Sequence, residues 1–81
     1  MKLQLRFFAG LRERVGKREA EQEIDEGATV ADLWATLCRE SPQLSDYTSS
    51  VSFAVNREYV DSDYALKEGD EVALIPPVSG G

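Results

Sequence analysis

The segment from residue 28 to residue 42, ATVADLWATLCRESP, constrains the fold more than any other part of the chain. Val30, Leu33 and Leu37 recur at helical spacing, which predicts an amphipathic helix with one apolar face. A helix of this kind has to bury its apolar face against another layer of structure. The rest of the chain therefore has to supply a second layer with an apolar face.

Alternation of apolar and polar residues predicts that the second layer is a sheet. At the start of the chain, Leu3, Leu5 and Phe7 point to one side and polar residues point to the other. One main amphipathic helix packed on one face of such a sheet gives a two-layer α+β domain. The predicted strands cover residues 2–8, 51–56 and 71–76, with a short strand near Tyr59 and Val60 and a weak one within residues 17–25.

The expected helix boundaries follow from residues that start or stop helices. Thr29 can cap the main helix and Asp32 follows three residues later, as in a capping box. Pro42 ends the helical pattern, and the polar segment 42–50 is predicted to be a loop. A shorter helix is expected before Gly16, which can adopt the left-handed conformation that ends helices.

The weak strand is markedly acidic. Glu19, Glu21, Glu23 and Asp25 share one side of it, while the other side offers little core material. We interpret it as an edge strand whose charges discourage pairing with another edge. A functional role for the acidic stretch Glu19 to Glu26 is the alternative, and the sequence alone does not decide between them.

Composition excludes several classes of function. The net charge of −6 argues against nucleic acid binding, which needs a basic surface. No apolar run is long enough to cross a membrane, and Gln4 and Arg6 interrupt the start of the chain where a signal peptide would be apolar. The only cysteine, Cys38, cannot form an internal disulfide, so we expect a cytoplasmic protein.

The residues for conventional catalysis are also missing. The sequence has no histidine, so the commonest general base and metal ligand is absent, and no metal site is expected. Cys38 lies on or beside the apolar helix face, where a free cysteine usually behaves as a small hydrophobic residue. A sulfur-transfer role for this thiol is the alternative.

The last six residues, PPVSGG, suggest chemistry of another kind. Pro76 and Pro77 stop the strand and direct the chain away from the sheet. Val78, Ser79, Gly80 and Gly81 form a slender arm, and the six residues together can extend roughly 20 Å. Such an arm can deliver the terminal carboxylate into the active site of another protein. An incidental frayed terminus is the alternative.

The sequence resembles a known family, the MoaD-like small subunits of molybdopterin synthase, which are ubiquitin-like sulfur carriers. The segments LRFFAGLRERVG, FAVNREYV and LKEGDEVALIPPVSGG carry the resemblance, which extends over essentially the whole chain. It implies a ubiquitin-like β-grasp fold with a mixed sheet over residues 1–75 and a flexible carrier tail at 76–81.

The resemblance also implies a mechanism and partners. An ATP-dependent enzyme of the ubiquitin-activating type adenylates Gly81, and a sulfur donor protein converts the adenylate into a thiocarboxylate. The carrier then docks on the large subunit of the synthase, in a heterotetramer of two small and two large subunits, and passes its sulfur to a pyranopterin precursor. The carrier itself binds no cofactor, no nucleic acid and no membrane.

Finally, the resemblance implies a docking surface on the outer face of the sheet. Phe8 and Ile75 are apolar residues on faces that are otherwise polar, and Tyr59 precedes a predicted core residue. All three match interface positions of the family, and clustered exposed apolar residues usually mark an interface. Arg12 is a weaker candidate for an ion pair with a partner. The alternative is that loops of the chain itself cover some of these residues.

Three other functions remain compatible with the residues. The tail would equally serve a ubiquitin-like modifier that is joined through Gly81 to lysines of other proteins. A sulfur carrier for another pathway, such as thiazole synthesis, would share both the fold and the tail. A plain interaction domain with an incidental tail is the fourth possibility.

Overall fold

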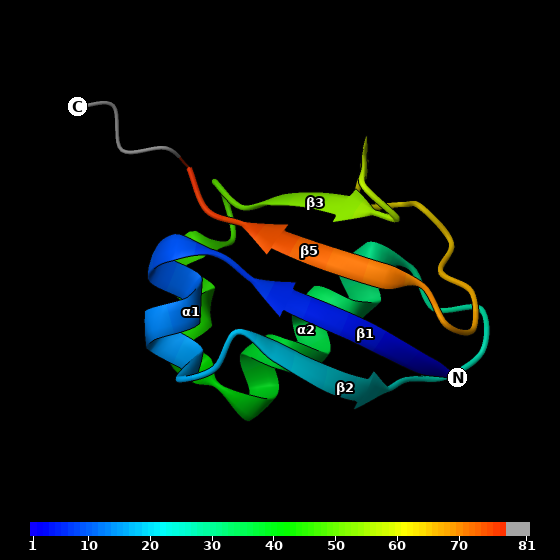
Figure 1. Cartoon of the computed structure of the whole chain (residues 1–81), viewed down its shortest axis with the longest axis horizontal. Coiled ribbons are helices and arrows are strands. Elements are labelled where there is room, and N and C mark those ends of the chain that lie inside the picture. Colours follow the sequence, from blue (N-terminus) through cyan, green and yellow to red (C-terminus); the bar gives the residue numbers. More distant parts are fainter. Residues whose placement is uncertain (78–81) are drawn as a thin grey trace.

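A computed structural model describes residues 1–77 and shows a five-stranded mixed sheet in the order β2-β1-β5-β3-β4 (Figure 1). Helix α2 crosses behind the sheet, and α1 lies at the end where β1 and β5 finish. The predicted two-layer α+β architecture is thus confirmed. In chain order the elements are β1 (Lys2–Phe7), α1 (Ala9–Val15), β2 (Glu19–Glu23), α2 (Val30–Glu40), the 3-10 helix η1 (Pro42–Tyr47), β3 (Ser52–Val55), β4 (Glu58–Val60) and β5 (Glu71–Ile75).

The core lies between the sheet and α2. The predicted apolar stripe is buried, and Trp34 packs edge-to-face on Phe53, with ring centres 5.8 Å apart. The indole Nε1 of Trp34 donates a hydrogen bond to Thr48 Oγ1 (3.0 Å), so its polar atom is satisfied. The core cluster comprises Leu3, Leu5, Phe7, Leu11, Val30, Leu33, Trp34, Leu37, Leu44, Phe53, Val55, Leu66, Val72 and Leu74.

The predicted helix boundaries are confirmed. The Thr29 hydroxyl accepts from the backbone N–H of Asp32 (3.2 Å), and the Asp32 carboxylate accepts from the N–H of Thr29 (2.9 Å). These two bonds form the complete capping box and satisfy two N–H groups that the first helical turn cannot pair. Gly16 ends α1 with a φ of 87°, in the left-handed region that suits glycine.

The first and last strands pair at the centre of the sheet. β1 and β5 are parallel, with Gln4 opposite Glu71 and Phe7 opposite Leu74, whereas the other neighbouring strands are antiparallel. Because β1 and β5 run in the same direction, Phe8 and Pro76, the residues that follow them, lie at the same end of the sheet. Phe8 and the end of β5 are therefore close together at one end of the sheet.

The prediction that residues 42–50 form a loop is wrong for their first part. Residues 42–47 form η1, and Leu44 within it is 1% exposed. Arg14 of α1 donates to the Gln43 carbonyl (3.2 Å), and Gln43 Nε2 donates to the Arg14 carbonyl (3.2 Å), so η1 is tied to α1. Leu44 and Tyr47 are the only large apolar residues within 42–50, too few to establish a helical period, so the sequence pattern did not reveal this short helix.

A tight turn at Asn56 and Arg57 joins β3 to β4. Both residues have positive φ, 51° and 73°, as the right-handed twist of a two-residue hairpin turn requires. The side chain of Asn56 accepts from the N–H of Glu71 (3.1 Å) and donates to the carboxylate of Asp70 (3.0 Å), which is only 8% exposed. These bonds fix the start of β5 against the turn.

Within residues 1–77 the longest α-helix, α2, has 11 residues, and no helix is long and apolar enough to cross a membrane.

Candidate functional site: the open face of the sheet

Helix α2 covers one face of the sheet, and the other face is open (Figure 1). The strand registers place Arg6, Ala73, Ala54 and Tyr59 in one row across β1, β5, β3 and β4. The two alanines in the middle of this row are too small to fill the space between their neighbours. A hollow of about 250 Å³ results, and its other lining residues are Phe8, Arg57, Glu71 and Ile75.

Three apolar side chains surround the hollow, and we call them the apolar patch: Phe8, Tyr59 and Ile75. Phe8 is 39% exposed and Tyr59 is 72% exposed, whereas Ile75 is half-buried. Phe8 lies between β1 and α1 as the N-cap residue of the helix, and its N–H donates to the Leu74 carbonyl (3.3 Å). The structure therefore brings three residues from distant parts of the sequence onto one surface.

Charged residues flank the apolar patch. The Arg6 guanidinium lies over the Phe8 ring, 5.7 Å from its centre, and such a contact is favourable because the ring face is electronegative. Arg57 and Glu71 complete the lining. Sequence reasoning did not select Arg6, Arg57 or Ala54 for this surface, since only the register between strands shows that they meet there.

The other predicted site residues lie elsewhere. Arg12 is exposed on α1 and does not line the hollow. Cys38 is half-buried on α2 beside the core. Burial raises the pKa of the Cys38 thiol above its ordinary value, and a hydrogen bond with Thr48 opposes this effect. A thiol with a raised pKa is a poor nucleophile at neutral pH, which favours the structural interpretation of Cys38.

The chain leaves the sheet beside the apolar patch. Ile75, the last residue of β5, lines the hollow, and the next two residues differ, since Pro76 is buried and Pro77 is exposed. The packed part of the described chain therefore extends one residue beyond β5. The predicted carrier residues Val78, Ser79, Gly80 and Gly81 lie outside the described residues.

Residues 1–77 contain no group of three or more cysteine, aspartate, glutamate or histidine side chains arranged to hold a metal ion. The described part of the site consists of an apolar hollow with two cations and one carboxylate around it, an arrangement that suits contact with another surface.

The model of the ThiS family matches residues 5–81, which is nearly the whole chain. The chain belongs to the ThiS family. Among relatives, the molybdopterin synthase sulfur carrier subunit of Chlamydomonas reinhardtii is 42% identical over 83 residues and covers all of both chains. The human protein of the same name is 36% identical, over 93% of this chain and 89% of the relative. The small archaeal modifier protein 3 of Haloferax volcanii is 38% identical over the whole of both chains.

Solved structures that are similar to this ThiS family protein confirm that it has the ubiquitin-like β-grasp fold. The crystal structure of SAMP1 from Haloferax volcanii superposes with a TM-score of 0.88 at 32% identity over all of both chains. A complex of subunits 1 and 2 of the molybdopterin-converting factor from Helicobacter pylori contains a chain with a TM-score of 0.71 at 24% identity, also over all of both chains. The resemblance to the molybdopterin synthase carriers, suggested by the sequence segments above, is confirmed by the named relatives.

Proposed function

We propose that this chain is the sulfur carrier subunit of a molybdopterin synthase and that Gly81 carries the sulfur. The observation that carries the proposal is the position of the apolar patch. It surrounds a hollow at the end of β5, from which residues 76–81 continue. A partner that covers the patch is therefore next to the point where the chain leaves the sheet.

In this proposal the carboxylate of Gly81 attacks the α-phosphate of ATP on an activating enzyme, which forms an acyl-adenylate and releases pyrophosphate. The persulfide of a sulfur donor protein then attacks the acyl carbon and breaks its bond to AMP. A second thiol cleaves the resulting acyl disulfide, which leaves a thiocarboxylate on Gly81 and a disulfide between the two thiols. The ionised sulfur of the thiocarboxylate is a nucleophile at neutral pH, so the carrier needs no general base of its own. The absence of histidine from the sequence is compatible with this chemistry.

The proposed partner in the last step is the large subunit of the synthase, in a heterotetramer of two small and two large subunits, where two transfers build the dithiolene of molybdopterin. The relatives in Chlamydomonas reinhardtii and humans are named as subunits of molybdopterin synthase, which supports this assignment. The Helicobacter pylori structure shows a chain of the same fold in complex with a second subunit. We further propose that the carrier binds no cofactor, that ATP is consumed by the activating enzyme, and that these steps take place in the cytoplasm.

The test is the intact mass of the full chain after incubation with an activating enzyme, ATP and a sulfur donor. We expect a mass increase that matches replacement of one oxygen by sulfur, and loss of this product when Gly81 is deleted. Isopeptide adducts on lysines without any thiocarboxylate would support the modifier function instead. The small archaeal modifier relative makes this second outcome worth measuring.

A further inference from the structure

The edge of the sheet at β2 is unpaired, and it lies on the opposite side of the sheet from β4. Antiparallel pairing directs the N–H and C=O groups of alternate residues towards the neighbouring strand. Arg18 and Ile24, at the two ends of this pairing, bond to Phe7 and Met1 (2.8 and 2.9 Å). By alternation, the backbone groups of Glu19, Glu21 and Glu23 point outwards (the register is Glu21 opposite Gln4).

Little in the described chain satisfies this edge. Gln22 Nε2 donates to the Glu23 carbonyl (3.3 Å), but within residues 1–77 the outward N–H groups of Glu19, Glu21 and Glu23 have no backbone partner. A row of free N–H and C=O groups is a template for an additional strand. The three glutamates repel a second copy of this acidic edge, whereas they would attract a strand of opposite charge.

A seam between β2 and α2 runs along the same edge and contains two hollows. The first, of about 90 Å³, has an apolar lining that includes Ala20, Leu37 and Leu44, with Glu21 and Glu40 among its polar residues. Gln22 donates to Glu40 across the seam (3.5 Å). An aliphatic side chain of an added strand would fit here, because strands place alternate side chains on opposite faces of a sheet.

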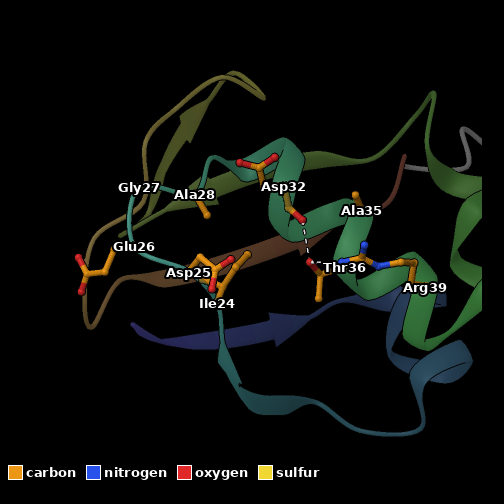
Figure 2. Close-up of a pocket in the computed structure, with 9 residues that line it drawn as sticks. All are labelled: Ile24, Asp25, Glu26, Gly27, Ala28, Asp32, Ala35, Thr36 and Arg39. Atoms are coloured by element: carbon orange, nitrogen blue, oxygen red, sulfur yellow. Dashed lines mark hydrogen bonds between the residues drawn. The ribbon is translucent and has the colours of Figure 1, made fainter.

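Figure 2 shows the second hollow, of about 400 Å³, at the other end of the seam. Asp25 and Glu26 come from the segment after β2, whereas Asp32, Thr36 and Arg39 come from successive turns of α2. Arg39 donates to Thr36 Oγ1 (3.3 Å), and the lining of this hollow also contains the carboxylates of Asp25, Glu26 and Asp32. Together the two hollows contain five carboxylates and two cations, so the seam as a whole is acidic.

We propose that β2 and the β2–α2 seam form a second docking surface, which takes an extended partner segment with alternating cationic and aliphatic residues. The segment adds a sixth strand to the sheet. Its cationic side chains lie beside Glu19, Glu21 and Glu23 on the open face, and its aliphatic side chains lie over the seam. The apolar patch lies on strands further along the sheet, so both surfaces can be occupied at once.

The first test uses the full-length protein, labelled with ¹⁵N, and the capped peptide Lys-Val-Lys-Val-Lys-Val-Lys at low salt. Amide exchange at Glu19, Glu21 and Glu23 is expected to slow when millimolar peptide is added, whereas Ala20 and Gln22 are already protected by β1. Exchange that slows equally at odd and even positions, or not at all, would overturn strand addition. A matching peptide with glutamate in place of lysine should not bind.

Two further peptides separate strand pairing from simple charge attraction. One is N-methylated at the lysines and the other at the valines, so each lacks every second backbone donor. Only one of the two sets of N–H groups can face β2, so one peptide should bind and the other should not. Equal binding of both would show that charge alone attracts the peptide and would contradict the proposal.

Charge reversal on each edge strand tests whether the peptide binds at β2. Glu21→Lys should weaken binding of the lysine–valine peptide about fivefold, because it reverses a charge beside the added strand. Glu58→Lys makes the same change of charge on β4, the opposite edge strand, and should leave the affinity unchanged. Equal loss in both variants would mean that net charge controls binding, and the seam would then not be the site.

Discussion

Asn56 connects two parts of the sheet that are distant in sequence. It occupies a turn position with φ of 51° and bonds through its side chain to Asp70 and to the N–H of Glu71. The buried carboxylate of Asp70 keeps a second donor, the N–H of Lys67 (2.9 Å). Both the backbone conformation and the amide side chain therefore suit asparagine at this position.

Two substitutions separate these contributions. Asn56→Gly keeps the positive φ accessible but removes the side-chain bonds, so we expect a loss of about 1–3 kcal/mol in unfolding free energy. Asn56→Ala should cost about 1 kcal/mol more, because an L-residue with a Cβ is strained at this φ. Chemical denaturation measures both values, and equal stability of the two variants would show that the backbone strain is negligible.

Tyr59 exposes most of its ring at the apolar patch, so its main effect should be on binding. Tyr59→Glu is expected to weaken binding of the proposed large subunit at least tenfold, about 1.4 kcal/mol, while stability changes by less than about 1 kcal/mol. Calorimetric titration and thermal unfolding measure the two effects. Arg39→Glu, on the helical side of the molecule, is the control and should not affect this affinity. A large loss of stability in Tyr59→Glu would show that the ring supports the fold instead.

Cys38 gives a prediction with a defined pH dependence. Burial raises its pKa, so the thiol stays protonated at neutral pH and should react slowly with iodoacetamide. Because the folded state holds this proton more tightly than the unfolded state, its contribution to stability is present at low pH and is lost as the pH rises through the raised pKa. Alkylation at neutral pH as fast as that of an unstructured cysteine peptide would contradict this assignment.

At the level of single elements, the capping box of α2 is the clearest case in which local sequence determines a boundary. Thr29→Ala removes the acceptor for the Asp32 N–H and should lower the unfolding free energy by about 1 kcal/mol. Arg39→Ala, at an exposed position in the same helix, is the control and should change stability by less than about 0.5 kcal/mol. Similar losses in the two variants would mean that the cap is not what stabilises the helix start.

The elements also show how far the sequence could predict this structure. Periodicity identified α2 and the strands at residues 2–7, 52–55 and 71–75, because their apolar residues repeat on one side. The edge position of β2 followed from its charges. The turn at Asn56 and Arg57 lacks the Asn-Gly or Asp-Gly pair that is the strongest short hairpin signal, and η1 contributes only Leu44 to the core.

The candidate site was predictable only in part. Phe8 and Ile75 were conspicuous as apolar residues on polar faces, and the structure places both beside the hollow. The hollow depends on Ala54 lying beside Ala73, which is a consequence of register between β3 and β5. Register is fixed by packing between distant segments, so no local pattern reveals which small residues become neighbours.

For the whole molecule, β5 holds the two halves of the sheet together. It pairs with β1 on one side and β3 on the other, and it contributes Val72 and Leu74 to the core. A chain that ends at Asp70 should therefore lose cooperative thermal unfolding and its dispersed NMR spectrum. A chain that ends at Pro77 should melt within about 2 °C of the full-length protein, since the described core ends at Leu74. Cooperative unfolding of the shorter chain would contradict this role of β5.

The central pairing of β1 with β5 also sets an order of events during protein synthesis. β1 is made first, but until residues 71–75 have been made β2 is its only available neighbour in the sheet. Contacts between residues so far apart in the sequence form slowly, and β5 cannot join β1 to β3 before its own residues have been made. Because Ala73 and Ile75 line the hollow, the candidate docking surface is incomplete until β5 has been made. A chain that stops before residue 75 would therefore lack the surface that we propose for binding of the large subunit.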